Sequence, residues 1–132
     1  MGTRYAKNAG AVHALNYHLV WCPKYRRPVL TSPVGERLKS LLNETAAEHG
    51  MSIQAMEVLP DHLHLFVEAD PTLAVAEIVN RFKGRSSRVL RQEFPHLRSR
   101  LPTLWSRSDF AATTGQVSET TIRRYIEAQK GR

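Results

Sequence analysis

The sequence contains a single cysteine, Cys22, in 132 residues. An internal disulfide is therefore impossible, and the chain differs from small secreted domains that depend on several disulfides. No apolar run approaches the roughly 20 residues of a membrane span, and the N-terminus has no signal-peptide hydrophobic core. We therefore expect a cytoplasmic protein that does not enter a membrane.

Acidic residues are also few, since 12 Asp and Glu stand against 19 Lys and Arg and give a formal net charge of +7. Such an excess favours a polyanionic partner, first nucleic acid and then an anionic membrane surface. The length and the 42% of hydrophobic residues suit one globular domain with one core. We expect a single domain over residues 1–132, in which the polar residues 1–12 form a loose tail.

Strand and helix patterns alternate along the rest of the chain. Apolar alternation predicts strands at 15–22, 52–59 and 110–117, and one that begins at His62. Helical periodicity predicts helices from Pro33 to Gly50 with Ser32 as N-cap, over 72–92, and over 119–130 with Ser118 as N-cap. Residues 93–108 are predicted to be a basic connection. This order predicts an α+β fold of the ferredoxin-like (RRM-like) type, with a central antiparallel sheet, helices on one face and an additional C-terminal helix.

The motif PDHLH at residues 60–64 carries the most informative pattern in the chain. Apolar residues after a Pro-Asp turn signal predict a strand, so His62 and His64 share one face while Leu63 and Leu65 occupy the other. The Cα atoms of the two histidines then lie about 6.5–7 Å apart, which lets both rings bind one divalent metal ion. The alternative is two surface imidazoles on the solvent side of a half-buried strand.

The last predicted helix places Tyr125 and Gln129 one turn apart, on the face that also carries Ile122 and Ile126. A tyrosine hydroxyl can attack phosphorus and form a covalent aryl ester. The glutamine carbonyl can offer an oxygen ligand to the metal that the histidines bind. Since a tyrosine on an apolar helix face is more often a core residue, the spacing leaves both interpretations open.

Four blocks of the sequence resemble the signature segments of one family, the single-tyrosine HUH transposases (TnpA type) of small bacterial and archaeal insertion sequences. The blocks are YHLVWCPKYRR at 17–27, MEVLPDHLHL at 56–65, FKGRSS at 82–87 and YIEAQ at 125–129. They occur in the family's order and span nearly the whole chain. The His-hydrophobic-His block is shared with replication initiators and relaxases, whereas the first and third blocks are not.

The resemblance implies that Tyr125 is the nucleophile, that His62 and His64 are metal ligands, and that Gln129 is the third metal-binding side chain. It implies an enzyme that binds hairpin-bearing single-stranded element ends and cuts and rejoins this DNA through a 5′-phosphotyrosine intermediate. It further implies a homodimer, in which the tyrosine helix of one subunit can complete the site of the other. Such a protein works in the cytoplasm and is associated with the nucleoid when it acts.

Imidazole and oxygen ligands suit Mn²⁺ and tolerate Mg²⁺ as the divalent cofactor, and zinc stays open as an alternative. Glu68, on the same strand face as the two histidines, is an alternative oxygen ligand to Gln129. One residue departs from the family pattern: Asp109 stands where the family usually has an aromatic residue, commonly tyrosine.

Basic residues cluster in two places that are candidates for DNA contact. In the first, basic side chains can contact phosphates while a tyrosine ring stacks on a base. In the second, basic side chains at helical spacing can line a groove for a DNA hairpin, although a solvated helix face is the alternative. The first cluster is Lys24, Tyr25, Arg26 and Arg27, and the second is Arg81, Lys83, Arg85 and Arg88.

Three other functions fit part of the pattern. A non-catalytic ferredoxin-like nucleic-acid-binding module needs aromatic residues on its central strands, where this chain has His62 and His64 and only Phe66 as a candidate. A two-histidine phosphodiesterase needs a second H-x-T or H-x-S element, and none of the remaining histidines has Thr or Ser two residues on. A host-maintained HUH tyrosine nuclease that acts on dispersed palindromic repeats would share every catalytic residue, so this alternative stays open.

Overall fold

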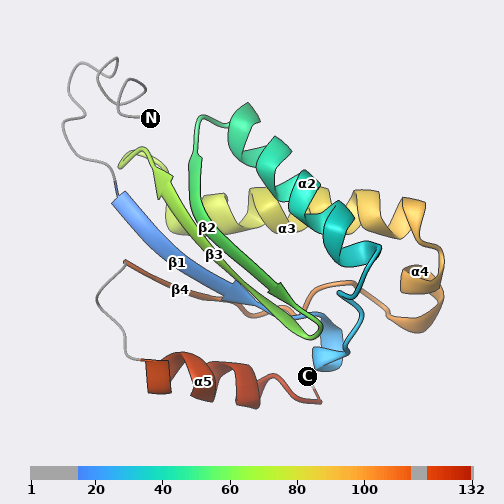
Figure 1. Ribbon diagram of the computed structural model, residues 1–132. Helices are drawn as coiled ribbons and strands as arrows, with labels where there is room; N and C mark the ends of the chain where they lie inside the picture. The colour runs from blue at the N-terminus through green and yellow to red at the C-terminus, as the bar shows by residue number, and fades with distance from the viewer. Residues whose placement is uncertain (1–14, 114–118, 132) are drawn as a thin grey trace.

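A four-stranded antiparallel sheet forms the centre of the molecule, as shown by a computed structural model that describes residues 15–113 and 119–131 (Figure 1). The strand order is β2-β3-β1-β4, and all three neighbouring pairs are antiparallel. The strands are β1 (Leu15–Trp21), β2 (Ser52–Leu59), β3 (His62–Ala69) and β4 (Phe110–Thr113). The predicted tail at 1–12, the predicted continuation of the last strand and the predicted cap at Ser118 lie outside the described residues.

Two long helices, α2 (Val34–Glu48) and α3 (Val75–Glu93), cover one face of the sheet, and α5 (Glu119–Ala128) lies against the other (Figure 1). The remaining elements are a short 3-10 helix, η1 (Lys24–Arg26), and a five-residue helix, α4 (His96–Arg100). This strand order, with its helices, confirms the predicted ferredoxin-like α+β fold and its additional C-terminal helix.

The core lies between the sheet and the layer of α2 and α3. Burial alternates strictly along β3, where Leu63, Leu65 and Val67 are at most 1% exposed and their neighbours are partly exposed. Phe82 of α3 is fully buried in the same core. The apolar side chains of β3 thereby fix which side chains of the strand face α5.

The hairpin of β2 and β3 has the limits that the sequence predicted. β2 spans Ser52–Leu59, and Leu59 is paired with His62 across the turn. The Pro-Asp dipeptide interrupts the strand pattern, because Pro60 has no backbone N–H for a ladder bond. The turn therefore places Asp61 directly before the first histidine.

The start of α2 differs from the predicted one. Pro33, not Ser32, occupies the cap position, and no side chain caps the helix. Backbone groups satisfy the first turn instead, because Gly35 N donates to Thr31 O at 3.0 Å. The Ser32 hydroxyl is therefore not needed in the role that the sequence predicted for it.

The connection predicted for residues 93–108 contains α4, which the sequence analysis missed. Leu97 of this helix is fully buried, and the apolar residues after it, Leu101, Leu104 and Trp105, are at most 5% exposed. Exposed basic residues between these apolar anchors obscure a periodicity that is only five residues long. The segment is therefore part of the core and not a solvated loop.

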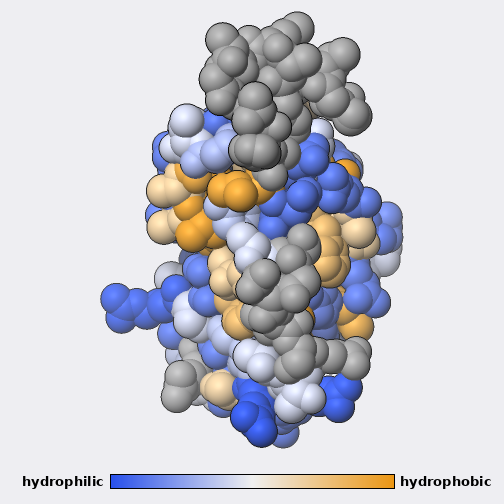
Figure 2. All heavy atoms as spheres, turned by 90° about the vertical axis from the view of Figure 1, so that its left-hand side faces the viewer, coloured by the Kyte–Doolittle hydropathy of each residue, from blue (hydrophilic) through white to orange (hydrophobic). Residues whose placement is uncertain are grey.

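Hydrophilic side chains cover most of the end of the molecule that Figure 2 shows, and they surround small hydrophobic patches. This distribution fits the charged composition of the chain. Within residues 15–113 and 119–131, no helix is both long and apolar enough to span a membrane.

Candidate functional site

The two histidines of β3 lie on the sheet face that α5 covers. Leu63 and Leu65 are fully buried on the other face, whereas His62 and His64 are partly exposed, so the predicted alternation is confirmed. Together with α5 they form a pocket of about 340 Å³, which we call the histidine pocket. It is lined by Arg26, Asp61, His62, His64, Ile122, Arg123, Ile126 and Glu127.

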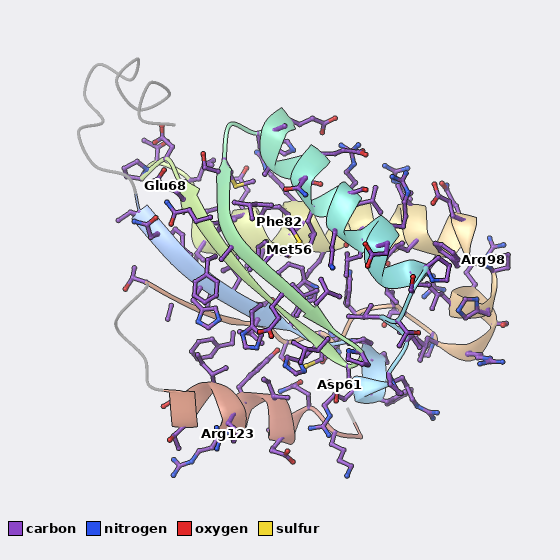
Figure 3. All side chains as sticks on the ribbon, in the orientation of Figure 1. Met56, Asp61, Glu68, Phe82, Arg98 and Arg123 are labelled. Atoms are coloured by element: carbon purple, nitrogen blue, oxygen red, sulfur yellow. The ribbon has the colours of Figure 1, made fainter. Side chains whose placement is uncertain are left out.

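His62 is held by the carboxylate that precedes it. Asp61 Oδ1 lies 2.8 Å from His62 Nδ1, and Asp61 Oδ2 lies 3.1 Å from Arg26 Nε. Figure 3 shows Asp61 at the turn of the β2–β3 hairpin. An ionised carboxylate only accepts hydrogen bonds, so Nδ1 of His62 carries a hydrogen and Nε2 is the ring nitrogen left for another partner. A histidine with this partner is arranged as metal-binding histidines commonly are.

His64 has a different partner, His18 of β1, whose Nε2 lies 3.0 Å from His64 Nδ1. His18 also stacks on Phe66, its partner in the strand register, with ring centroids 4.1 Å apart. Burial lowers the pKa of both His18 and His64, and the charge of His62 lowers the pKa of His64 further. Both imidazoles are therefore neutral at pH 7, which is the form that binds metal ions.

Arg26 connects the hairpin turn to α5. Its Nη1 donates to Ile126 O at 3.3 Å and lies 3.6 Å from Glu127 Oε2, while its Nε holds Asp61. Its side chain is only 17% exposed. The sequence predicted a DNA contact for Arg26, and the structure gives its guanidinium protein partners on two elements.

Tyr125 lies on α5 beside the segment that leads into β4. Its hydroxyl is 3.5 Å from Ser108 Oγ, and its ring centroid is 5.8 Å from that of Phe110. Burial raises the pKa of Tyr125 to about 12, so the phenol is protonated at neutral pH. Tyr125 does not line the histidine pocket, although Ile122 and Ile126 of the same helix do.

Gln129 follows α5 and is 3% exposed. Its Oε1 accepts hydrogen bonds from Ser106 Oγ at 3.1 Å and Ser108 Oγ at 2.6 Å, and its Nε2 donates to Tyr125 O at 3.2 Å. It lines a second pocket of about 370 Å³, which we call the glutamine pocket. The residues of that pocket are Lys24, Tyr25, Ser106, Arg107, Ser108, Gln129 and Gly131.

The predicted site residues therefore fall into two groups in this chain. His62 and His64 line the histidine pocket, whereas Gln129 lines the glutamine pocket. Tyr125 contacts Ser108, which belongs to residues 106–108, here called the serine segment. Glu68, the alternative ligand, lies at the opposite end of β3 from Asp61 (Figure 3), six residues from the first histidine. At about 3.3 Å per residue this is roughly 20 Å, so Glu68 does not reach the pocket.

Lys83 holds the serine segment in place from α3. Its Nζ donates to Ser106 O at 2.9 Å and Ser108 O at 3.3 Å, and lies 3.5 Å from Asp109 Oδ2. Burial lowers the pKa of Lys83, while the carboxylate of Asp109 opposes this effect. Asp109, which departs from the family pattern, is thus an ion-pair partner, and Lys83, predicted to contact DNA, has a structural role.

We expect Lys83→Met to destabilise the protein by about 1–3 kcal/mol, because two carbonyl oxygens and a carboxylate lose their donor. Urea denaturation measures the free energy of unfolding. Arg88→Met, the same kind of change at an exposed position of α3, is the control and should change stability by less than about 0.5 kcal/mol. Equal stabilities of the two variants would contradict the structural role of Lys83.

The other basic residues of α3 lie in the helix layer, on the far side of the sheet from the histidine pocket. Arg85 pairs with Glu44 at 2.7 Å and with Glu48 at 2.6 Å, both on α2. Arg81 pairs with Glu77 at 2.5 Å, and Arg88 is exposed. The structure therefore does not bring these arginines together with the histidines.

The cluster around η1 lies close to the glutamine pocket. Tyr25 is 38% exposed. Lys24 Nζ lies 5.2 Å and Arg27 Cζ 5.9 Å from its centroid. The structure thus brings together an aromatic ring and two cations, as the sequence predicted for this cluster.

The predicted metal site has its two histidines in the histidine pocket. Within the described part of the chain, no group of three or more His, Cys, Asp or Glu side chains is placed to hold a metal ion. A third protein ligand must therefore be of another type, such as an amide oxygen, or come from a residue outside this pocket.

Sequence reasoning missed His18 and the serines that hold Gln129. His18 has the strand parity that faces α5, but its distance to His64 depends on the pairing of two strands that are 46 residues apart. Ser106 and Ser108 alternate within a stretch that resembles a loop. Only the turn motif gave a local signal, since Asp61 directly precedes His62.

The chain is similar in sequence to known transposases. Residues 11–129 match the family model described as IS200-like transposase. The chain is 39% identical to the ISDra2 transposase TnpA of Deinococcus radiodurans, over 93% of this chain and 89% of that protein. It is 29% identical to the transposase for insertion sequence element IS200 of Salmonella typhimurium, over 86% of this chain and 75% of that protein.

Solved structures share the fold. A Deinococcus radiodurans crystal structure assigned as a transposase has a TM-score of 0.85 and 36% identity, covering 93% of this chain and 96% of that one. A REP-associated tyrosine transposase bound to a REP hairpin has a TM-score of 0.54 and 15% identity, covering 89% and 65%. The four sequence blocks and these likenesses agree, and the chain belongs to the family of IS200-like transposases, enzymes that cut and join DNA.

Proposed function

We propose that this transposase cuts and rejoins single-stranded DNA at hairpin-bearing element ends, with Tyr125 as the nucleophile. In this proposal His62, His64 and Gln129 hold one divalent metal ion, Mn²⁺ or Mg²⁺. The observation that carries the proposal is the histidine pocket, where two imidazoles with partnered Nδ1 atoms face the helix that bears the tyrosine.

The donor set fits such an ion. Imidazole nitrogens and an amide oxygen are neutral ligands, and this mixture suits Mn²⁺. When bound, the ion supplies Lewis-acid polarisation of the scissile phosphate. The carboxylate of Asp61 directs His62, and Arg26 holds that carboxylate in place.

The chemical step exchanges one phosphate ester for another. The Tyr125 hydroxyl oxygen attacks phosphorus, a bond from this oxygen to phosphorus forms, and the bond to the 3′ oxygen breaks. The phenol gives up its proton and the departing 3′ oxygen takes one up, with water carrying the proton between them, so the strand leaves with a 3′-hydroxyl and the DNA stays attached as a 5′-phosphotyrosine. Because no ester bond is lost, another 3′-hydroxyl can reverse the step and join a new strand.

Charge and fold support DNA hairpins as the substrate. The formal net charge is +7, and the exposed residue Tyr25, which lines the glutamine pocket, has the cations of Lys24 and Arg27 near its ring. An aromatic ring among cations suits a stacked base and its phosphates. The REP-associated tyrosine transposase, which shares this fold, was solved bound to a REP hairpin.

Incubation with labelled single-stranded hairpin DNA and Mn²⁺ tests the proposal. We expect a covalent protein–DNA species on denaturing gels, together with a shorter strand that ends in a 3′-hydroxyl, and neither product with EDTA. Hairpin binding without any covalent product would instead favour a non-catalytic nucleic-acid-binding module.

We further propose that the protein acts as a homodimer with shared sites. In one chain, the Gln129 oxygen and the Tyr125 hydroxyl contact the serine segment and do not line the pocket of their own histidines. A second subunit can supply the missing groups across a two-fold axis.

Mixing two inactive variants tests the shared site. We expect His62→Ala/His64→Ala subunits and Tyr125→Phe subunits to recover cleavage when mixed, because one site of each mixed dimer then holds both histidines and the tyrosine. Gel analysis of labelled DNA measures the recovery. If mixed dimers form, as shown by two distinct tags, and cleavage stays absent, each site is built within one subunit.

A further inference from the structure

We propose that His18 is a positioning residue for His64. In this arrangement His18 Nε2 accepts a hydrogen bond from His64 Nδ1, and His64 Nε2 is left to bind the metal. The inference rests on the proposed function, because it assigns a partner to one ligand of that site. The observation is the 3.0 Å distance between His64 Nδ1 and His18 Nε2.

Only one hydrogen can lie between two nitrogens that are 3.0 Å apart, so one ring donates and the other accepts. If His18 Nε2 carries the hydrogen, His64 has its own hydrogen on Nε2 and cannot bind a metal through that atom. If His64 Nδ1 carries it, His64 Nε2 has a lone pair, and His18 has its hydrogen on Nδ1. The metal site therefore requires His18 as the acceptor.

The position of His18 is fixed independently of any metal. The strand register pairs it with Phe66, and the two rings stack with an interplanar angle of 18°. Its ring also lies 5.2 Å from that of His64, at 29°. An imidazole held on one side by an aromatic ring presents its Nε2 at a constant place, which is what a positioning residue requires.

The two histidines of β3 thus have partners of different charge. His62 faces a carboxylate, whereas His64 faces a neutral ring. A carboxylate raises the basicity of its histidine more than a neutral acceptor does. Asp61 and His18 therefore orient both ligands, and only one of these two partners carries a negative charge.

Two substitutions at this position separate the hydrogen bond from packing. His18→Phe keeps a ring for stacking on Phe66 but has no acceptor. His18→Gln offers its Oε1 near the place of the imidazole Nε2 and restores the acceptor. Titration calorimetry with Mn²⁺ should show about 10–100-fold weaker binding for the Phe variant, and binding close to wild type for the Gln variant.

Nitrogen-15 NMR of the metal-free wild-type protein provides the second measurement, because imidazole nitrogen shifts report which nitrogen carries the hydrogen. We expect His64 to carry its hydrogen on Nδ1 and His18 on its own Nδ1. This measurement needs neither DNA nor metal, and it decides the inference even if the Phe variant fails to fold.

The outcomes distinguish this inference from the proposed function. If the wild-type protein binds Mn²⁺ and a folded His18→Phe variant binds it with the same affinity, the role of His18 is overturned and the metal site stands. A His64 hydrogen on Nε2 in the wild-type protein would overturn it as well. A wild-type protein that binds no Mn²⁺ would overturn the metal site itself, and the NMR result alone would then decide whether His18 orients His64.

Discussion

Tyr125→Phe is expected to abolish the covalent protein–DNA species and to reduce cleavage of hairpin DNA by about a thousandfold or more. The substitution removes one hydroxyl and keeps the ring that packs 5.8 Å from Phe110. Within the described residues, the only polar contact that the substitution removes is the 3.5 Å contact between the tyrosine hydroxyl and Ser108 Oγ. Folding and hairpin binding should therefore be unchanged, as measured by circular dichroism and a gel-shift assay.

Tyr25→Phe is the matched control, because it removes a hydroxyl from an exposed tyrosine beside the glutamine pocket. This variant should still form the covalent species, since stacking needs only the ring. A covalent species that persists in Tyr125→Phe would show that another tyrosine is the nucleophile, and Tyr17 and Tyr25 would be tested next.

The double substitution His62→Ala/His64→Ala should abolish both Mn²⁺ binding and cleavage. Removal of both imidazoles leaves no nitrogen ligand at the histidine pocket. The cost in stability should be modest, about 1–2 kcal/mol, because Asp61 keeps its ion pair with Arg26 and the core face of β3 is untouched. Calorimetry measures the Mn²⁺ affinity, and thermal denaturation measures the stability.

His96→Ala serves as its control, because this histidine is exposed on α4, away from the pocket. It should bind Mn²⁺ and cleave DNA as the wild type does. Unchanged Mn²⁺ affinity in the double variant would remove the metal site from the proposed function, whatever its effect on cleavage.

Local patterns were sufficient for most of the fold. The limits of β2 follow from the Pro-Asp turn, and the burial of β3 follows from alternation over eight residues. The missed helix α4 is too short for a periodicity, and its anchor Leu97 has arginine one residue later. At the start of α2, Ser32 is a residue type that commonly caps helices, but backbone hydrogen bonds satisfy the first turn and its side chain does not cap the helix.

The candidate site was predictable only in part. The shared face of His62 and His64 is a property of one strand, so the sequence contained it. The partnership of His64 with His18 depends on strand register, and the contacts of Gln129 depend on where a distant segment packs. Such relations arise from tertiary structure and leave no periodic trace in a single sequence. The resemblance to the family supplied roles for Tyr125 and Gln129, but not their positions in this chain.

The way in which α5 is attached has a consequence for the energetics of its motion. Among the described residues of α5, only Ile122 is a buried hydrophobic side chain. The guanidinium of Arg26 and the hydrogen bonds of Gln129 supply polar attachment. Water can replace polar contacts at small net cost, whereas the core between the sheet and the other helices is apolar. We therefore expect release of the helix to be a local transition whose free energy lies below that of global unfolding, so that the tyrosine can change its position while the sheet that carries the histidines stays folded.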